Sequence, residues 1–457
     1  MNILVINGSP AGKDSITLQT VLYIQKFFPS VTFSFLHAGR KIRQMKQDFT
    51  ECEKALKEAD LLLFCYPVYT FLVPAQLHRF IELIKEHALD LSGKYATQIS
   101  TSKHFYDSTA HQFIRDNCED LRLKYLQGLS ADMEDLLQEK GRKEALSFFR
   151  FVLWNMEHHF AEPAFYPIKN GCLPSAVMAD VPAQSQTKKP GKIVVVTDTD
   201  REKKSSLNSM IARFEAVMDR EVSVVNLAEF PFAGGCMGCF HCASDGTCIY
   251  KDGFDRYLRE NIQSAEAIVY AFAIKDHSMG YRFKLYDDRQ FCNGHRTVTM
   301  GKPVGYMISG NLDSEPNLRT LIEARAQVGG NYLAGIATDQ TDPDGGINQM
   351  AQTLSYAIEN QYLPPKNFYG VGGLKIFRDL IYQMQGLMRE DHRFYKKHGF
   401  YDFPQKHRGK IAAMYLVGAM MSSKSLKKKI GGRMTEGMLM PYRSVLKKAD
   451  GNLKKRS

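Results

Sequence analysis

The sequence predicts an α/β protein with two tandem, doubly wound parallel-sheet domains and a basic C-terminal extension. Short β-branched apolar runs alternate with helical patterns, which is typical of parallel sheets covered by helices on both faces. This alternation begins at residues 2–6 and begins again at residues 192–197. The positive net charge of +11 is concentrated near the C-terminus, outside both alternating regions.

The first copy of the pattern opens with the apolar run at residues 2–6, which ends in Gly8-Ser9-Pro10 and leads into a helical pattern from Ser15. The later apolar runs are short enough for strands, and helical stretches separate most of them. A segment at about residues 182–191, rich in Ala, Pro, Gln, Ser, Thr and Lys, is typical of a linker. Further strands of this copy are expected at residues 31–36, 61–65, 95–100 and 125–131.

The two copies can be overlaid, which indicates an internal repeat. Gly93-Lys94 matches Gly301-Lys302, and residues 125–132 match residues 332–339, at separations of 32 and 31 residues. Between its first and third strands the second copy is longer by about 16 residues, and these contain a cluster of cysteines. We therefore predict α/β domains at residues 1–181 and 192–365, with a helical, basic extension at residues 366–457.

The excess of positive charge belongs to the tail alone. Residues 408–457 contain 13 basic and two acidic residues, so residues 1–407 are neutral overall. A nucleic-acid footprint needs basic residues spread over a folded face, and the main body has no such excess. The basic tail next to an apolar run fits contact with an anionic membrane face or an acidic redox partner, or simply a solvated end.

The N-terminal sequence, the apolar runs and the cysteines indicate where in the cell the protein is located. The N-terminal sequence MNILVING has no basic segment followed by an apolar core, so a secretory signal is not expected. The longest apolar run, residues 411–421, spans 11 residues, whereas a membrane-spanning helix needs about 20. Nine cysteines, an odd number, indicate reduced thiols and a cytoplasmic location.

The loop after the first strand has the composition of an anion site. A small-residue turn between a strand and a helix presents backbone N–H groups and the positive end of the helix dipole to an anion. Hydroxyls at Ser9, Ser15 and Thr17 add donors, and Lys13 can add charge. The spacing matches neither a Walker A loop nor a Rossmann fingerprint. An ordinary strand-to-helix turn is the alternative interpretation.

Two further loops are expected at the same sheet edge. Residues 67–71 (Pro-Val-Tyr-Thr-Phe) follow the third strand, and residues 101–103 (Thr-Ser-Lys) follow the fourth. Ligands of open parallel sheets lie outside the carboxyl ends of the strands, so the three loops converge there. One loop can bind phosphate while the others flank a flat ring, although loop aromatics also serve plain packing.

These residues resemble the flavodoxin-like NAD(P)H-dependent FMN reductases and quinone reductases. The resemblance implies that Ser9, Ser15, Ile16 and Thr17 hold the FMN phosphate, and that residues 67–71 and 101–103 border the flavin ring. NAD(P)H as electron donor is implied by the resemblance only, and no catalytic acid or base is assigned. The predicted cofactor-binding residues are Ser9, Pro10, Lys13, Ser15, Ile16, Thr17, Pro67, Val68, Tyr69, Thr70, Phe71, Thr101, Ser102 and Lys103.

The second copy departs from this pattern. Its loop at residues 197–206 has no Gly-Ser-Pro, and Asp198, Asp200 and Glu202 would repel a phosphate dianion. Ala273-Ile274-Lys275 stands where Pro-Val-Tyr is expected. We expect this copy to lack a flavin.

Four cysteines with short gaps form the strongest chemical signal. Three thiolates at two-residue gaps, with a fourth nearby, can surround one compact inorganic core such as a [4Fe-4S] cluster. Zinc, which usually takes two separated Cys-x2-Cys pairs, and unliganded thiols are the alternatives. The box is similar to that of iron-sulfur flavoproteins. The predicted ligands are Cys236, Cys239, Cys242 and Cys248, whereas Cys52, Cys65, Cys118, Cys172 and Cys292 are interpreted as core or surface thiols.

Together these features predict an oxidoreductase that moves electrons from NAD(P)H or a reduced carrier, through FMN and a [4Fe-4S] cluster, to a quinone-like molecule or a protein acceptor. The two copies are expected to form an intramolecular pseudo-dimer that places one FMN near one cluster, and homo-oligomers are compatible with this. A non-catalytic FMN electron carrier, or an FMN protein whose cysteines bind zinc or no metal, is the alternative.

Overall fold

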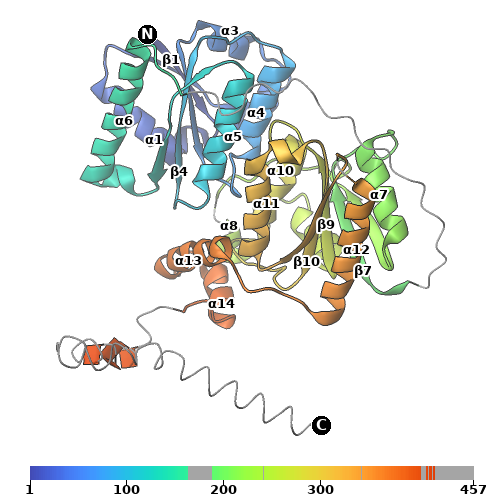
Figure 1. Ribbon diagram of the computed structural model, residues 1–457. Coiled ribbons are helices and arrows are strands. Elements are labelled where there is room, and N and C mark those ends of the chain that lie inside the picture. Colours follow the sequence, from blue (N-terminus) through green and yellow to red (C-terminus); the bar gives the residue numbers. More distant parts are fainter. Residues whose placement is uncertain are drawn as a thin grey trace, which may run out of the picture. The chain divides into compact units, whose positions relative to one another are not determined.

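The computed structural model describes residues 1–162, 188–239, 241–340, 342–402, 408–409, 411–413 and 415–416. The chain divides into two compact units, residues 1–397 and 398–457. The first unit contains two parallel sheets and all the elements considered below (Figure 1). Most of the predicted linker, Cys172 and nearly all of the basic tail lie outside the described residues.

The first sheet has six parallel strands. Its strand order is β2-β1-β3-β4-β5. Strand β6 also pairs with β4, at residues that follow those paired with β5. Side chains alternate between two buried faces, as in any strand covered on both sides. Ile3 and Val5 face helices α1 (Ile16–Phe27) and α6 (Glu139–Glu157), whereas Leu4 and Ile6 face the other layer. The strands are β1 (Asn2–Asn7), β2 (Thr32–Leu36), β3 (Leu61–Pro67), β4 (Tyr95–Ser102), β5 (Lys124–Tyr125) and β6 (Leu129–Asp132).

The second sheet has five parallel strands in the order β8-β7-β9-β10-β11. Helices α7 (Ser206–Val217) and α12 (Pro343–Asn360) cover one face. Numbered within each sheet, the strands of both sheets follow the order 2-1-3-4-5. This is the flavodoxin-like order. The strands are β7 (Lys189–Thr197), β8 (Arg220–Asn226), β9 (Ala267–Ala273), β10 (Pro303–Ser309) and β11 (Tyr332–Thr338).

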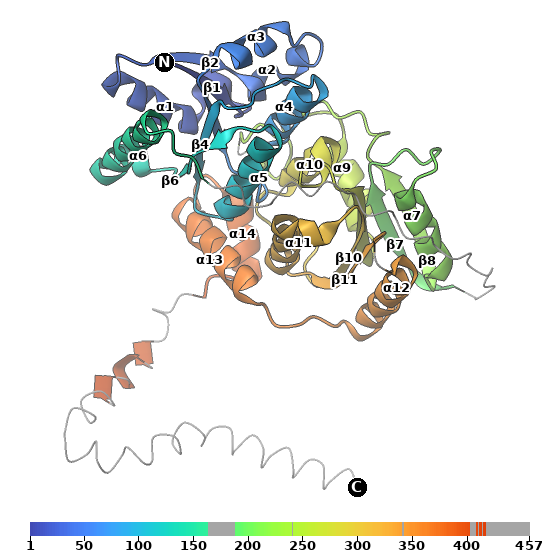
Figure 2. The same cartoon turned by 45° about the horizontal axis from the view of Figure 1, so that its top comes forward.

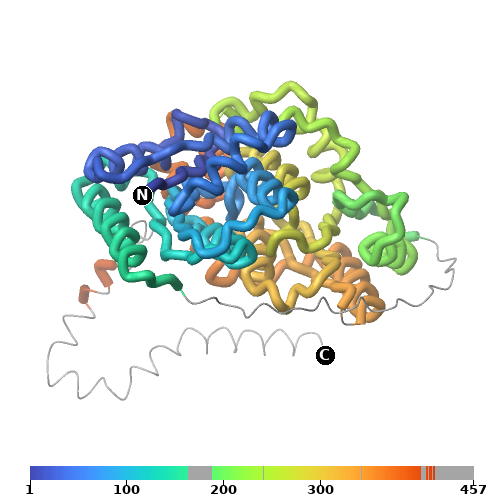
Figure 3. The backbone as a smooth tube through the Cα atoms, turned by 90° about the horizontal axis from the view of Figure 1, so that it is seen from above, coloured from blue at the N-terminus to red at the C-terminus, as the bar shows by residue number. Residues whose placement is uncertain are grey.

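The facing helix layers of the two sheets lie side by side (Figures 1 and 3), and their buried side chains belong to one hydrophobic core. Helix α4 (Ala75–Glu86) packs against α10 (Gly280–Arg289), and α5 (Asp107–Asp120) packs against α11 (Pro316–Gly329). Buried side chains from all four helices meet in this cluster, among them Phe80, Phe113, Phe283 and Leu321. Because the core is continuous, the two sheet domains are packed together in one compact unit.

The interface between the two sheets is pseudo-symmetric: a contact made by a residue of one half has a counterpart made by the matching residue of the other half. The Ala75 amide donates to Asp288 Oδ2 at 2.8 Å, and the Tyr281 amide donates to Glu82 Oε1 at 2.8 Å. The tight turn closed by Tyr69 and Leu72 has a counterpart closed by Lys275 and Ser278. Each turn holds two central residues at positive φ, Thr70 and Phe71 in the first and Asp276 and His277 in the second.

His277 joins the halves electrostatically. Its Nε2 lies 3.1 Å from Asp120 Oδ2 and its Nδ1 lies 3.0 Å from Glu315 Oε1. Burial alone would lower the pKa of this imidazole, but the hydrogen bonds to Asp120 and Glu315 raise it to about 10. The imidazolium is therefore the form held at this interface at neutral pH.

Replacement of His277 by Asn, which tolerates a positive φ, is expected to lower the melting temperature at neutral pH. A folded-state pKa above the unfolded value of about 6.5 means that the stabilisation is complete below that pH and is lost as pH rises through about 10. The difference in melting temperature between wild type and variant should therefore shrink between pH 7 and pH 10.5. A difference that grows over this range would contradict the assignment.

Two helices that follow the second sheet belong to the first compact unit. Helix α13 (Phe368–Gln383) packs on α11 (Figure 2). Helix α14 (Arg389–Lys397) packs on the short α8 (His241–Asp245). The sequence placed both in the extension from residue 366, whereas the compact unit continues to Lys397. Within the described residues no helix is both long and apolar enough to cross a membrane.

Candidate functional site

The loop after β1 is held in a fixed shape by Asn7. The Ser9 amide donates to Asn7 Oδ1 at 3.1 Å, and Asn7 Nδ2 donates to the Gly12 carbonyl at 2.7 Å. Helix α2 (Ala38–Met45) presses on the same loop, because a Cβ at Gly39 would lie 2.3 Å from the Gly8 carbonyl oxygen. Only glycine permits this approach, so the loop has little freedom to move.

The N-terminus of α1 opens into this loop. Ser15 caps the helix through its Oγ, which accepts from the Leu18 amide at 3.4 Å, and the first turn contains no acidic residue. The buried Thr17 hydroxyl lies 2.5 Å from the Thr101 hydroxyl at the end of β4. Free amide donors and the helix dipole therefore converge with several buried hydroxyls, which is the donor set that a phosphate needs.

The turn after β3 is fixed by the second domain. Lys284 Nζ donates to the Tyr69 carbonyl at 2.9 Å and to Thr70 Oγ1 at 2.6 Å, while Thr70 Oγ1 donates to Asp288 Oδ1 at 2.7 Å. Lys284 and Asp288 are fully buried and also pair with each other. Two consecutive left-handed residues are strained in isolation, and these contacts from α10 hold them in place.

One cavity of about 470 Å³ joins the predicted flavin loops to the cysteine box. All four predicted metal ligands, Cys236, Cys239, Cys242 and Cys248, line it. Pro10 and Lys13 are the predicted residues that do not line it. The predicted cofactor residues in its wall are Ser9, Ser15, Ile16, Thr17, Pro67, Val68, Tyr69, Thr70, Phe71, Thr101, Ser102 and Lys103.

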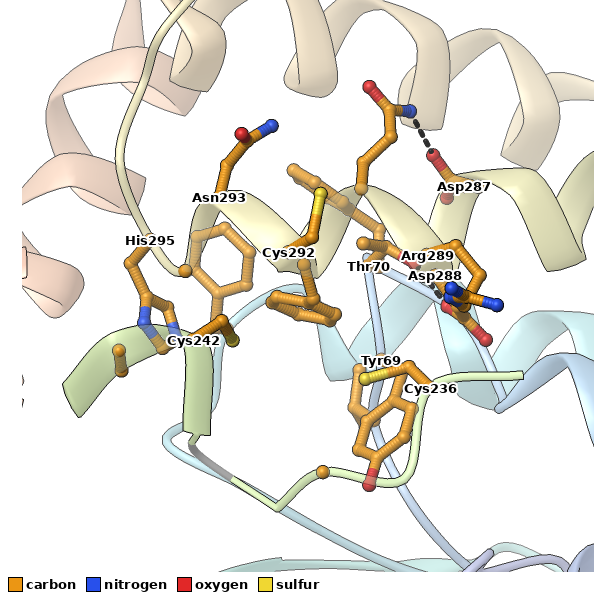
Figure 4. A pocket seen from close by; sticks show the side chains of 18 of the residues that line it. Tyr69, Thr70, Cys236, Cys242, Asp287, Asp288, Arg289, Cys292, Asn293 and His295 are labelled. Carbon is orange, nitrogen blue, oxygen red and sulfur yellow. Dashed lines mark hydrogen bonds between the residues drawn. The ribbon is translucent and has the colours of Figure 1, made fainter. Parts of the chain in front are cut away.

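Tyr69 lies against the cysteine loop. A Cβ at Gly238, which has a φ of +63°, would lie 2.0 Å from the Tyr69 hydroxyl oxygen. Figure 4 shows the Tyr69 ring beside Cys236, and burial together with Cys236 and Asp288 raises the pKa of the Tyr69 phenol well above its usual value. The aromatic turn of the first domain thus contacts the cysteine loop of the second.

Arg289 holds the residues that lead into the cysteine loop. It donates to the Gly234 carbonyl at 2.9 Å and forms two hydrogen bonds of 2.8 Å with Asp252. Its guanidinium also lies 4.5 Å from the centroid of the Tyr250 ring, whose hydroxyl donates to the Gly235 carbonyl at 3.0 Å. A bidentate, stacked arginine is a rigid anchor, so the glycine-rich approach to Cys236 has a defined path.

The four thiols are not arranged around a single ion. Among the described residues, the only group of three or more candidate ligand atoms within 4.8 Å of one another lies elsewhere in the molecule. Tetrahedral zinc with Zn–S bonds of about 2.3 Å would bring its sulfurs to about 3.8 Å. Burial raises the pKa of the Cys242 thiol to about 11.

A fifth cysteine lies in this cavity and was missed by the sequence interpretation. Cys292, just after α10, is 2% exposed and lines the same cavity as the box (Figure 4). Burial, with Cys248 nearby, raises the pKa of its thiol to about 12. Because it lies far from the box in sequence, no spacing rule could have placed it there.

The helices after the second sheet form part of the wall. Phe377 of α13 stacks on Phe105 with ring centroids 4.2 Å apart, and Ile376 and Leu380 also line the cavity. Behind the cysteine box, the fully buried Asp391 of α14 accepts from His295 Nδ1 at 2.9 Å and from Arg296 at 3.2 Å. No local sequence pattern indicates either role.

The corresponding edge of the second sheet is filled by carboxylates. Asp339, directly after β11, is buried and accepts from the Gly310 amide at 2.9 Å and from the Ser309 hydroxyl at 2.6 Å. Asp198 follows β7, and burial raises the pKa of its carboxyl to about 6. Donors that an open loop would offer to an anion are here bonded to the chain's own side chains.

Comparison with known proteins agrees with the geometry. A family model described as NADPH-dependent FMN reductase matches residues 1–117. The iron-sulfur flavoprotein of Archaeoglobus fulgidus is 24% identical over 174 residues, which are 36% of this chain and 79% of that protein. Human ribosyldihydronicotinamide dehydrogenase (quinone) is 35% identical over 69 residues, 15% of this chain and 30% of that enzyme.

A solved NAD(P)H:quinone oxidoreductase from Methanothermobacter marburgensis is 15% identical, with a TM-score of 0.28, and the match covers 35% of this chain and 98% of that one. The chain thus spans most of the iron-sulfur flavoprotein but less than a third of the human dehydrogenase. Residues 1–117, which contain the predicted phosphate loop and the aromatic turn, are thus similar to the NADPH-dependent FMN reductases.

Proposed function

We propose that the protein is an FMN-dependent oxidoreductase in which one FMN and one [4Fe-4S] cluster share a single cavity between the two sheets. Electrons pass from NAD(P)H or a reduced carrier to a quinone-like molecule or a redox protein. The observation that carries this proposal is that the predicted flavin loops and all four cysteines line one cavity of about 470 Å³.

The first domain would hold the flavin. Ser9, Ser15 and Thr17, with the amide groups at the start of α1, would bind its phosphate, and the turn at residues 67–71 would border its ring. FMN supplies the capacity to accept a hydride and to release electrons singly or in pairs. The protein's part is to hold this group and to exclude water, and the buried Phe71, packed 4.9 Å from Phe105, closes one side of the cavity.

The second domain would hold the cluster and no flavin. Its own phosphate-loop position is occupied by Asp198, and Asp339 takes the donors at the end of β10. The contact between Tyr69 and Gly238 brings the aromatic turn against the cysteine loop, which suits electron transfer between two groups in one cavity. The pseudo-dimer is supported by the exchange-related contacts of α4 and α10.

A visible spectrum of anaerobically purified protein, with iron and flavin analysis, tests the proposal. FMN gives bands at about 370 and 450 nm, and a cluster adds a broad shoulder at about 400 nm. We expect about four iron atoms per FMN. A protein with flavin bands and zinc but no iron would refute the cluster. A protein with both groups that fails to oxidise NAD(P)H with quinone or ferricyanide would be an electron carrier instead.

Gly39→Ala is expected to abolish or strongly weaken FMN binding. The added Cβ would stand 2.3 to 2.4 Å from backbone atoms of Gly8 and Ser9, so either the loop or α2 must move. Binding is measured by quenching of FMN fluorescence. Gly372→Ala in α13 is the matched control, since its Cβ meets nothing within 4 Å. Equal flavin affinity in both variants would remove the loop from the flavin site.

Contact of the basic tail with a membrane face, homo-oligomer formation and a cytoplasmic location stay predictions.

A further inference from the structure

A separate cluster of side chains that can bind a metal lies at the interface between the two sheets, at the position related to Lys284 by exchange of the two halves. It consists of His78 and Glu82 of α4 and Asp276 from the turn after β9. His78 is fully buried and Glu82 is 3% exposed, so two of the three groups have no access to bulk water. The cluster draws ligands from both halves of the interface and is independent of the proposed flavin and cluster site.

His78 has no hydrogen-bond partner at either ring nitrogen among the described residues, and Asp276 Oδ2 also lacks one. A buried polar group left without a hydrogen bond is destabilising, so a histidine of this kind beside two carboxylates needs an explanation. The ring of His78 packs 4.8 Å from the Phe113 ring.

His78 stands just beyond hydrogen-bond distance of both carboxylates. His78 Nε2 lies 3.8 Å from Asp276 Oδ2 and 3.9 Å from Glu82 Oε1. Both separations exceed a hydrogen bond, and a bridging water with tetrahedral angles would need about 4.6 Å. Two ligands at about 2.0 to 2.2 Å from one tetrahedral Zn²⁺ ion stand about 3.3 to 3.6 Å apart, so both pairs lie within about 0.5 Å of the spacing that zinc requires.

The remaining carboxylate oxygens are bonded to neighbouring cations. Asp276 Oδ1 pairs with Lys85 at 3.1 Å, and Glu82 Oε2 pairs with Arg79 at 2.8 Å and with Lys275 at 3.2 Å. The Tyr281 amide donates to Glu82 Oε1. These contacts orient the carboxylates so that Asp276 Oδ2 and Glu82 Oε1 face His78, as outer partners orient metal ligands elsewhere.

The other half of the interface holds a cation at the equivalent position. Lys284 stands three residues after Tyr281, just as His78 stands three residues after Ala75, and these two amides make the exchange-related contacts with Glu82 and Asp288. The ammonium of Lys284 lies among the Tyr69 carbonyl, Thr70 Oγ1 and Asp288. In the other half, the His78 imidazole stands in place of this ammonium, beside Glu82 and Asp276.

We propose that His78, Glu82 and Asp276 bind a Zn²⁺ ion that links the two halves of the interface. The donor set, one imidazole nitrogen and two carboxylates, matches the ligands that Zn²⁺ accepts, and a water can take the fourth position. Since ligands come from α4 and from the turn after β9, the ion stabilises the docking of the two sheets.

The test is a Zn²⁺ titration of metal-free, full-length protein that carries Cys239→Ser and Cys242→Ser, so that the thiol box cannot supply four sulfurs. We expect one equivalent of zinc with a nitrogen and oxygen shell near about 2.0 to 2.1 Å in X-ray absorption, and a higher melting temperature. Adding His78→Gln is expected to weaken binding about tenfold or more and to remove the thermal shift.

Two further variants guard against loss of folding. His87→Gln changes an exposed histidine at the end of the same helix and should leave zinc binding intact. Asp276→Asn keeps the shape of the side chain at a φ of +52°, which asparagine tolerates, and should weaken zinc binding as His78→Gln does. Zinc binding that survives both ligand substitutions, a sulfur shell near about 2.3 Å, or no binding at micromolar Zn²⁺ would each overturn the proposal.

Discussion

Iron content is expected to fall from about four atoms per chain to nearly none when Cys239 is replaced by serine, with FMN content unchanged. Cys239 is exposed, so its substitution should not disturb packing, and the flavin loops belong to the other sheet. The measurement is iron and flavin analysis of anaerobically prepared protein, with the shoulder near about 400 nm lost and the flavin bands retained.

Cys292→Ala is the decisive companion variant. Cys292 lines the same cavity but lies outside the box, so the proposed ligand set expects it to retain iron. Loss of iron in Cys292→Ala together with retention in Cys239→Ser would mean that Cys292, and not Cys239, is the fourth cluster ligand. Retention of iron in Cys239→Ser and in each of the other three box variants would refute the box as the cluster site.

Asp391→Ala is expected to destabilise the protein by about 3 to 5 kcal/mol and to release iron faster on dilution. The carboxylate is fully buried, and its removal leaves the Arg296 guanidinium, which is 14% exposed, without its charge partner. Arg296 also donates to the Cys242 carbonyl at 3.3 Å, so the loss reaches the cysteine box directly. Urea denaturation and the rate of iron loss measure the two effects.

Asp379→Ala on the neighbouring helix α13 is the matched control. Asp379 also pairs with basic side chains, Lys375 and Arg378, but it is 42% exposed and should change stability by no more than about 0.5 kcal/mol. Equal destabilisation by the two substitutions would mean that α14 does not brace the box. Normal iron retention in a destabilised Asp391→Ala would separate a folding role from a role at the cysteines.

Much of the site is local in sequence, and that part could be predicted. The loop from Ser9 to Thr17, the turn at residues 67–71 and the cysteine box each occupy a short stretch. A strand that ends in a small-residue turn, or cysteines at two-residue gaps, has a structural meaning within a few residues. The parallel-sheet rule then placed the two flavin loops at one edge, and the structure brings both into one cavity.

What only the tertiary structure decided depends on contacts between residues far apart in the chain. Cys292 reaches the cavity because α10 ends there, and Asp391 reaches the cysteine box because α14 packs on α8. Neither position follows from hydrophobic period or spacing, since both result from how complete helices pack. The sequence alone thus predicted two α/β regions, a candidate anion loop and a thiol box, whereas packing across α4 and α10 decided that the loop and the box meet in one cavity.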